Sequence, residues 1–133
     1  REIPTDAPRT AGSETVLVVE DEPMVRTLIV REFERHGYTT LAAEDGEAAR
    51  RLAEAHDGPI HAIVTDAIMP RMGGVELVAH LRAARPGIEP LLMSGYPGER
   101  AGDMGGSALP CLKKPFAPVQ AVRRVRALLD GRR

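Results

Sequence analysis

Short apolar runs alternate with longer amphipathic segments along most of this chain. Runs rich in β-branched and aliphatic residues, which are typical of strands, occur at Thr15–Val19, Tyr38–Ala43, Ala62–Asp66, Leu91–Met93 and Pro110–Lys113. The first and third runs are almost continuously apolar, as strands buried on both faces of a parallel sheet are. The pattern therefore predicts a sheet that is covered by helices on both sides.

The segments between these runs repeat apolar residues at spacings of three and four, the period of a helix that packs on one face. Pro23 suits the first turn of the first helix, and Asp45 can cap the second. The last helix is expected from about Pro118 to Leu129. Between the fourth and fifth strands, the segment Pro97–Pro110 contains four glycines, so a helix there should be short or frayed. Strands that alternate with helices in this way predict an α/β fold with a parallel sheet and right-handed crossovers.

One domain accounts for most of the chain. The whole chain has 133 residues, 43% of them hydrophobic, which is enough for a single core. Residues 1–13 are rich in Pro, Thr, Asp, Gly and Ser and are predicted as a linker or disordered tail. Residues 14–130 are predicted as the domain, and residues 131–133 as a C-terminal tail.

Charge and cysteine content narrow the possible partners. A net charge of −1 gives no field that would recruit nucleic acid or an anionic membrane, and the apolar runs are too short to span a bilayer. The last helix carries Arg123, Arg124 and Arg126, which we predict to be a solvated face near its C-terminus. Cys111 is the single cysteine, so no internal disulfide can form, and we expect a reducing, cytoplasmic setting.

Polar side chains lie at the C-terminal ends of four of the predicted strands. Glu20 and Asp21 follow the first strand, Asp66 ends the third, Ser94 follows the fourth and Lys114 follows the fifth. Parallel strands point their carboxyl ends to the same edge of the sheet, where ligands bind in open α/β folds. We therefore expect three carboxylates, one hydroxyl and one ammonium group to meet in a single crevice.

Three carboxylates in one crevice repel each other. Two such charges about 4 Å apart cost roughly 4 kcal/mol at an effective dielectric constant near 20. A divalent cation removes this cost, and oxygen ligands without His or Cys favour Mg²⁺, with Mn²⁺ as a possible substitute. Such a site suits phosphate chemistry, in which Asp66 can act as the nucleophile toward phosphorus. Lys114 and the metal can neutralise the charge that develops, and the Ser94 hydroxyl can donate a hydrogen bond.

At this point the sequence resembles a known family, the receiver domain of two-component response regulators. The residues that carry the resemblance are Glu20-Asp21, Asp66 with Pro70 and Gly74 downstream, Ser94-Gly95, and Lys114-Pro115-Phe116. It covers roughly residues 14 to 130. It implies a flavodoxin-like, doubly wound fold with a five-stranded parallel sheet in the order 2-1-3-4-5 and five helices.

The resemblance also implies the role of each acid. Asp66 would be the phosphoacceptor and a ligand of Mg²⁺. Asp21 would bind the metal directly, Glu20 would act through a water molecule, and the backbone carbonyl of Ile68 would complete the protein ligands.

By the same resemblance, Ser94 and Lys114 contact the phosphoryl group, and the Lys114–Pro115 peptide bond is often cis. One position departs from the pattern. The family usually has Tyr or Phe three residues before the lysine, where this chain has Cys111. We therefore expect any conformational change to run through the loop after Ser94.

The function implied is acceptance of a phosphoryl group from a phosphohistidine onto Asp66, followed by a conformational switch. The domain would catalyse its own phosphorylation and dephosphorylation as a signalling module. The expected partners are the dimerisation and phosphotransfer domain of a histidine kinase, in cis or in trans, and a histidine phosphotransfer protein. We expect no contact with nucleic acid or a membrane from this segment.

Several contexts remain open at this stage. A linker-like segment precedes the domain and no output segment follows it, which favours the C-terminal receiver of a hybrid histidine kinase. A stand-alone single-domain regulator is the alternative. A phosphatase with an aspartyl nucleophile usually has a second acid two residues after the first, where this chain has Ile68. A pure interaction module would not need the complete set of acids.

Overall fold

The computed structural model describes residues 10–95 and 109–131 of the chain. In this part of the chain, five strands and four helices follow one another in the order β1 Thr15–Val19, α1 Pro23–Arg35, β2 Thr39–Ala43, α2 Gly46–Ala55, β3 Ala62–Asp66, α3 Gly74–Ala84, β4 Glu89–Ser94, β5 Cys111–Lys113 and α4 Pro118–Asp130. All strand pairs are parallel, and the sheet order is β2-β1-β3-β4-β5. The predicted fold class is confirmed. The fifth helix expected within residues 97–110 falls almost wholly outside the described residues.

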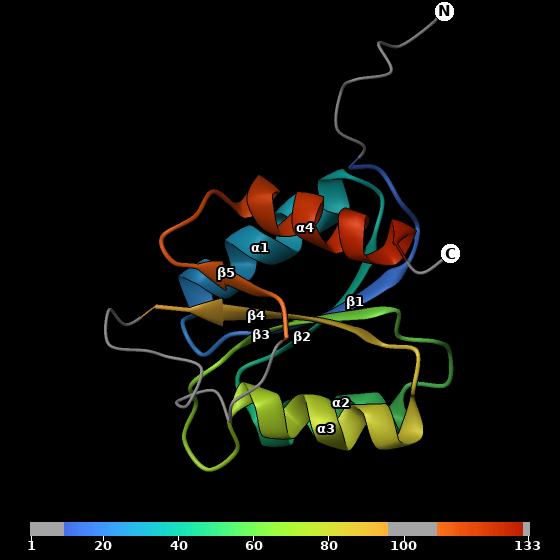
Figure 1. Ribbon diagram of the computed structural model, residues 1–133, viewed down its shortest axis with the longest axis vertical. Helices are drawn as coiled ribbons and strands as arrows, with labels where there is room; N and C mark the ends of the chain where they lie inside the picture. Colours follow the sequence, from blue (N-terminus) through green and yellow to red (C-terminus); the bar gives the residue numbers. More distant parts are fainter. Residues whose placement is uncertain (1–9, 96–108, 132–133) are drawn as a thin grey trace, which may run out of the picture.

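Helices cover both faces of the sheet, with α1 and α4 on one side and α2 and α3 on the other (Figure 1). Side chains alternate along each strand, so β1 contributes to two separate cores. Val16 and Val18 pack in the cluster that includes residues of α1 and α4, whereas Leu17 and Val19 pack in the cluster that includes residues of α2 and α3. All four side chains are fully buried. This double burial explains the continuous apolar run of β1.

The register of the sheet aligns the strand ends that carry the candidate residues. Val19 at the end of β1 lies opposite Thr65, the residue before Asp66 in β3. Asp66 lies opposite Met93, the residue before Ser94 in β4. The carboxyl ends of the three central strands are therefore level, and the polar residues that end or follow them come to one edge.

The loop after β3 is held close to the start of α3. Gly74 donates its N–H to the carbonyl oxygen of Ala67 at 2.9 Å. A Cβ atom at Gly74 would collide with the carbonyl oxygen of Asp66, so a larger residue could not start the helix at this position. In the loop between β2 and α2, Asp45 caps α2 as predicted by accepting the N–H of Ala48 at 2.8 Å.

Near the amino-terminal end of β1, Arg126 of α4 is buried. The prediction that Arg126 belongs to a solvated basic face is therefore wrong. Its side chain is only 7% exposed and forms ion pairs with Glu14 and Asp130, each at 2.9 Å. It also donates to the hydroxyl of Tyr38 at 3.2 Å and to the carbonyl oxygen of Ala11 at 3.4 Å. The segment just before β1 therefore lies against α4.

The ion pair between Glu14 and Arg126 should make stability depend on pH in the acid range. Hydrogen bonds from Arg126 lower the pKa of Glu14 from 4.5 to about 2. The unfolded chain then binds more protons than the folded one between these values, so the free energy of unfolding falls as the pH falls through this window. We expect Glu14→Gln to be less stable than the wild type at neutral pH and the two to converge as the pH approaches 2.

Urea unfolding at a series of pH values measures this difference. Glu44→Gln is the matched control, because Glu44 is exposed and has no ion-pair partner within residues 10–95 and 109–131. A Glu14→Gln variant that kept the full acid dependence of the wild type would show that the ion pair contributes nothing to stability.

Candidate functional site

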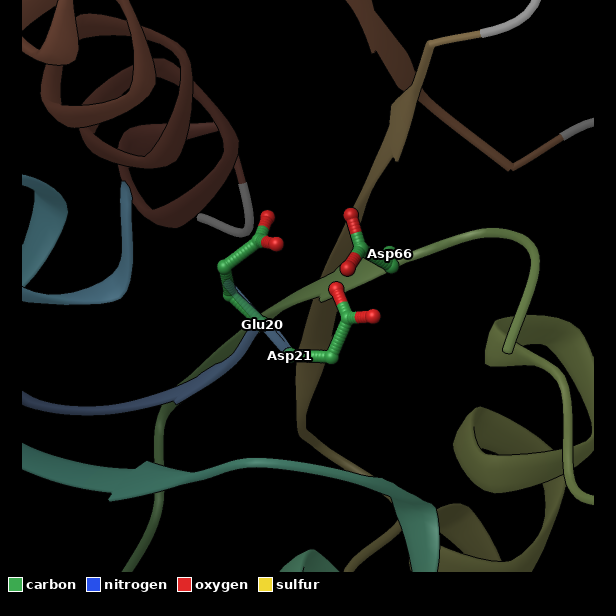
Figure 2. Close-up of side chains that lie close together, drawn as sticks. All are labelled: Glu20, Asp21 and Asp66. Carbon is green, nitrogen blue, oxygen red and sulfur yellow. The ribbon is translucent and has the colours of Figure 1, made fainter. Parts of the chain in front are cut away.

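Three carboxylates meet at the carboxyl edge of the sheet. Glu20 and Asp21 follow β1, Asp66 ends β3, and Figure 2 shows the three side chains turned toward one another. One oxygen atom from each lies within 4.8 Å of the others. The parallel topology therefore brings these acids together as predicted.

Lys114, which follows β5, provides a positive charge inside this cluster. Its Nζ lies 2.7 Å from Asp66 Oδ1 and 2.9 Å from Glu20 Oε1. Its backbone N–H donates to the carbonyl oxygen of Ser94 at 2.7 Å, and the Lys114–Pro115 peptide is cis, as the resemblance implies. Lys113, by contrast, is exposed. Of the two adjacent lysines, only Lys114 contacts the acids.

Burial makes the repulsion between the acids strong. Glu20 is 1% exposed and Asp66 is 6% exposed. Burial, and secondarily the neighbouring Glu20 carboxylate, raises the pKa of Asp66 to about 7, although the hydrogen bond from Lys114 opposes the rise. Burial also disfavours the charged form of Lys114, but its bonds to Asp66 and Glu20 outweigh this effect and raise its pKa. One lysine therefore does not fully compensate the acids.

The Glu20 side chain is tied at both oxygens. Oε1 accepts from Lys114, and Oε2 accepts the backbone N–H of Glu22 at 3.0 Å. The backbone carbonyl of Glu20 accepts from Nη1 of Arg26 at 2.7 Å. Asp21 is exposed and projects from the same loop. The Arg26 contact could not be predicted from the sequence, because it depends on how α1 leaves the loop.

Two further predicted residues, Ser94 and Ile68, lie at or just beyond the ends of β4 and β3. Ser94 ends β4, is 6% exposed, and is adjacent in the chain to Met93, the register partner of Asp66. The Ile68 side chain is 45% exposed, in the loop after β3. The structure thus groups Glu20, Asp21, Asp66 and Lys114 directly. Ser94 comes to the same end of the sheet through the pairing of β3 with β4, and Ile68 lies two residues after Asp66 in the chain.

The donor set of the cluster fits a hard divalent cation. It consists of carboxylate oxygens, the ligands that Mg²⁺ and Mn²⁺ prefer, and among residues 10–95 and 109–131 it contains no His or Cys. A cation would also offset the charge that Lys114 leaves uncompensated.

The described helices include none long and apolar enough to cross a membrane.

Comparisons with known proteins agree with this geometry. The family model of the response regulator receiver domain matches residues 16–126. The sensor kinase CckA of Brucella abortus (strain 2308) is 36% identical over 126 residues, which cover 90% of this chain and 13% of that protein. The alkaline phosphatase synthesis transcriptional regulatory protein PhoP of Bacillus subtilis (strain 168) is 34% identical over 117 residues, covering 86% of this chain and 48% of that protein. The chain thus spans half or less of these two relatives.

Solved structures show the same architecture. The receiver domain of the hybrid histidine kinase CckA matches with a TM-score of 0.73 and 31% identity, covering 86% of this chain and 98% of that one. A response regulator receiver protein from Sinorhizobium medicae WSM419 matches with a TM-score of 0.79 over 91% of this chain and 98% of that one. At 22% identity, the second match supports the fold alone.

Proposed function

The chain belongs to the response regulator receiver domain family of two-component signalling, and from this premise we propose that Asp66 accepts a phosphoryl group from a phosphohistidine. The observation that carries the proposal is the contact of 2.7 Å between Asp66 and Lys114 beside two further acids. A carboxylate that ends a buried strand next to a fixed ammonium group can act as a nucleophile while its neighbour neutralises the incoming phosphoryl oxygens.

In the proposed reaction, a carboxylate oxygen of Asp66 forms a bond to phosphorus. The bond between phosphorus and the imidazole nitrogen of the donor breaks, and that nitrogen keeps the electron pair. Negative charge spreads over the phosphoryl oxygens during transfer, and Lys114 and the Ser94 hydroxyl would stabilise it. Attack of water on phosphorus later breaks the bond between phosphorus and the Asp66 oxygen, which releases inorganic phosphate and returns the free carboxylate.

The acid cluster would hold the metal cofactor of this reaction. Asp21, Asp66 and the backbone carbonyl of Ile68 would bind Mg²⁺, with Glu20 acting through water. When bound, Mg²⁺ supplies positive charge against the phosphoryl oxygens. Lys114 keeps the acids partly compensated while no cation is bound.

Phosphorylation would also provide the switch. The phosphoryl group adds negative charge at a buried carboxylate, and this charge can draw the Ser94 hydroxyl and the loop that follows it toward Asp66. Receiver domains usually have an aromatic residue that relays this change, and this chain has Cys111 at that position. It is partly buried against the core cluster on the α2 and α3 side.

The setting that we propose is the receiver of a hybrid histidine kinase in the cytoplasm. Similarity to the sensor kinase CckA supports it, and the donor would be the dimerisation and phosphotransfer domain of such a kinase, in cis or in trans. A histidine phosphotransfer protein would be a second partner. The alternative setting is a stand-alone single-domain response regulator. The match to the transcriptional regulator PhoP, of which the aligned residues cover 48%, supports only the broader possibility of a receiver that is separate from the kinase.

A small donor with a phosphorus–nitrogen bond tests the reaction without a partner protein. We expect phosphoramidate to label the chain when Mg²⁺ is present and labelling to slow at least about 100-fold in excess chelator, because the metal contributes several kcal/mol to such transfers. Mn²⁺ should restore it. Labelling is followed by intact mass over time. An equal rate in chelator would refute the metal requirement, and steady hydrolysis of p-nitrophenyl phosphate would favour a phosphatase instead.

A further inference from the structure

Arg26 of α1 is the one charged side chain that contacts the backbone between the first two acids, among the residues that the structure describes. Its Nη1 donates to the carbonyl oxygen of Glu20 at 2.7 Å. That carbonyl belongs to the peptide unit that joins Glu20 to Asp21. The last sheet contact of this segment is the bond of 3.1 Å from the Glu20 N–H to the carbonyl oxygen of Ala43. Beyond it, the sheet no longer fixes the chain.

The two acids differ in how they are held. Both oxygens of the Glu20 side chain have partners, in Lys114 and the N–H of Glu22. The Asp21 side chain is exposed and has no hydrogen-bond partner within residues 10–95 and 109–131. Its position therefore depends on the backbone on either side of it.

The backbone is held on both sides of Asp21. The guanidinium of Arg26 holds the peptide before Asp21. After it, the first turn of α1 holds the chain through the backbone N–H of Arg26, which donates to the carbonyl oxygen of Glu22 at 2.9 Å whatever the side chain is. Ordering a backbone segment costs conformational entropy. A loop that is already ordered before the cation arrives pays less of this cost on binding.

We propose that Arg26 is a positioning residue of the metal site, which sets the direction of Asp21 by fixing the peptide between Glu20 and Asp21. This inference rests on the proposed function, because the metal site is part of it. The charge of Arg26 acts in the opposite direction, since a guanidinium near the ligands repels a divalent cation. The sign of the change in Mg²⁺ affinity therefore separates positioning from simple electrostatics.

Replacement of Arg26 by methionine is the direct test. We expect Arg26→Met to weaken Mg²⁺ binding about tenfold, as the loss of partners behind metal ligands does. Arg26→Lys should recover most of the affinity, because the contact is a single hydrogen bond to a carbonyl oxygen. The control is Arg31→Met on the same helix, where the side chain is exposed. Affinity is measured by isothermal titration calorimetry with Mg²⁺ alone.

A second measurement follows the loop without metal. Amide hydrogen exchange at Asp21 and Glu22 should speed up in Arg26→Met and not in Arg31→Met, while exchange in β3 stays slow in both. Slow exchange in β3 shows that the variant is folded. This readout separates a local effect on the loop from a general loss of stability.

Unchanged or tighter Mg²⁺ binding by Arg26→Met would overturn the positioning role. So would unchanged exchange at Asp21. A wild-type protein that binds no Mg²⁺ would remove the proposed metal site itself, whereas a wild type that binds Mg²⁺ beside an unaffected Arg26→Met would overturn only the role of Arg26.

Discussion

Replacing Lys114 by alanine will slow phosphoryl transfer to Asp66 by about 10²- to 10³-fold, the usual cost of removing one group that stabilises charge in a transition state. Lys114 lies 2.7 Å from Asp66 and 2.9 Å from Glu20, so in the proposed reaction its ammonium group would lie next to the incoming phosphoryl oxygens. Without it, two buried carboxylates face each other with no positive side chain between them, which further disfavours the ionised form of Asp66 as a nucleophile.

The adjacent lysine provides the matched control. Lys113 has the same charge and precedes Lys114 directly, but it is exposed. Lys113→Ala should therefore label at the wild-type rate in a time course with acetyl phosphate and Mg²⁺. Equal rates for Lys114→Ala and the wild type would show that the contact with Asp66 does not serve transfer.

Much of the fold follows from local sequence patterns. The continuous apolar runs of β1 and β3 indicated strands buried on both faces, and the structure buries them against helices on each side. The run at β4 predicted only Leu91–Met93, whereas the strand begins at Glu89. The first two residues of β4 were not predicted, because the second is Pro90 and a proline usually argues against a strand. Its place opposite Ile63 shows that the parallel ladder accommodates it.

The meeting of the acids could also be predicted, because it needs only parallel strands and their ends. The partners of Arg26 and Arg126 could not be predicted from the strand order, because each contact depends on how far a long side chain reaches from a packed helix. For Arg126 the sequence did hold a signal. It lies four residues after Val122 and three before Leu129, both buried, so helical spacing places it on the inner face. No sequence pattern pointed to the contact of Arg26, because its partner is the backbone carbonyl of Glu20, a group that every residue carries.

Asp66→Asn should abolish phosphorylation altogether. The substitution keeps the size and shape of the side chain but replaces the carboxylate with an amide, which is not a nucleophile at phosphorus. Asp66 is also one of the three acids in the cluster, so the variant loses a charge that the metal would offset. The remaining acids, Glu20 and Asp21, lie on another strand end and should not substitute for it.

The central claim, that Asp66 is the phosphoacceptor, is tested most directly by intact mass after incubation with acetyl phosphate and Mg²⁺. Asp57→Asn serves as the control, because Asp57 is exposed and lies outside the acid cluster. The wild type and Asp57→Asn should each gain a single phosphoryl group, and Asp66→Asn should gain none. Equal labelling of Asp66→Asn and the wild type would contradict the assignment of Asp66.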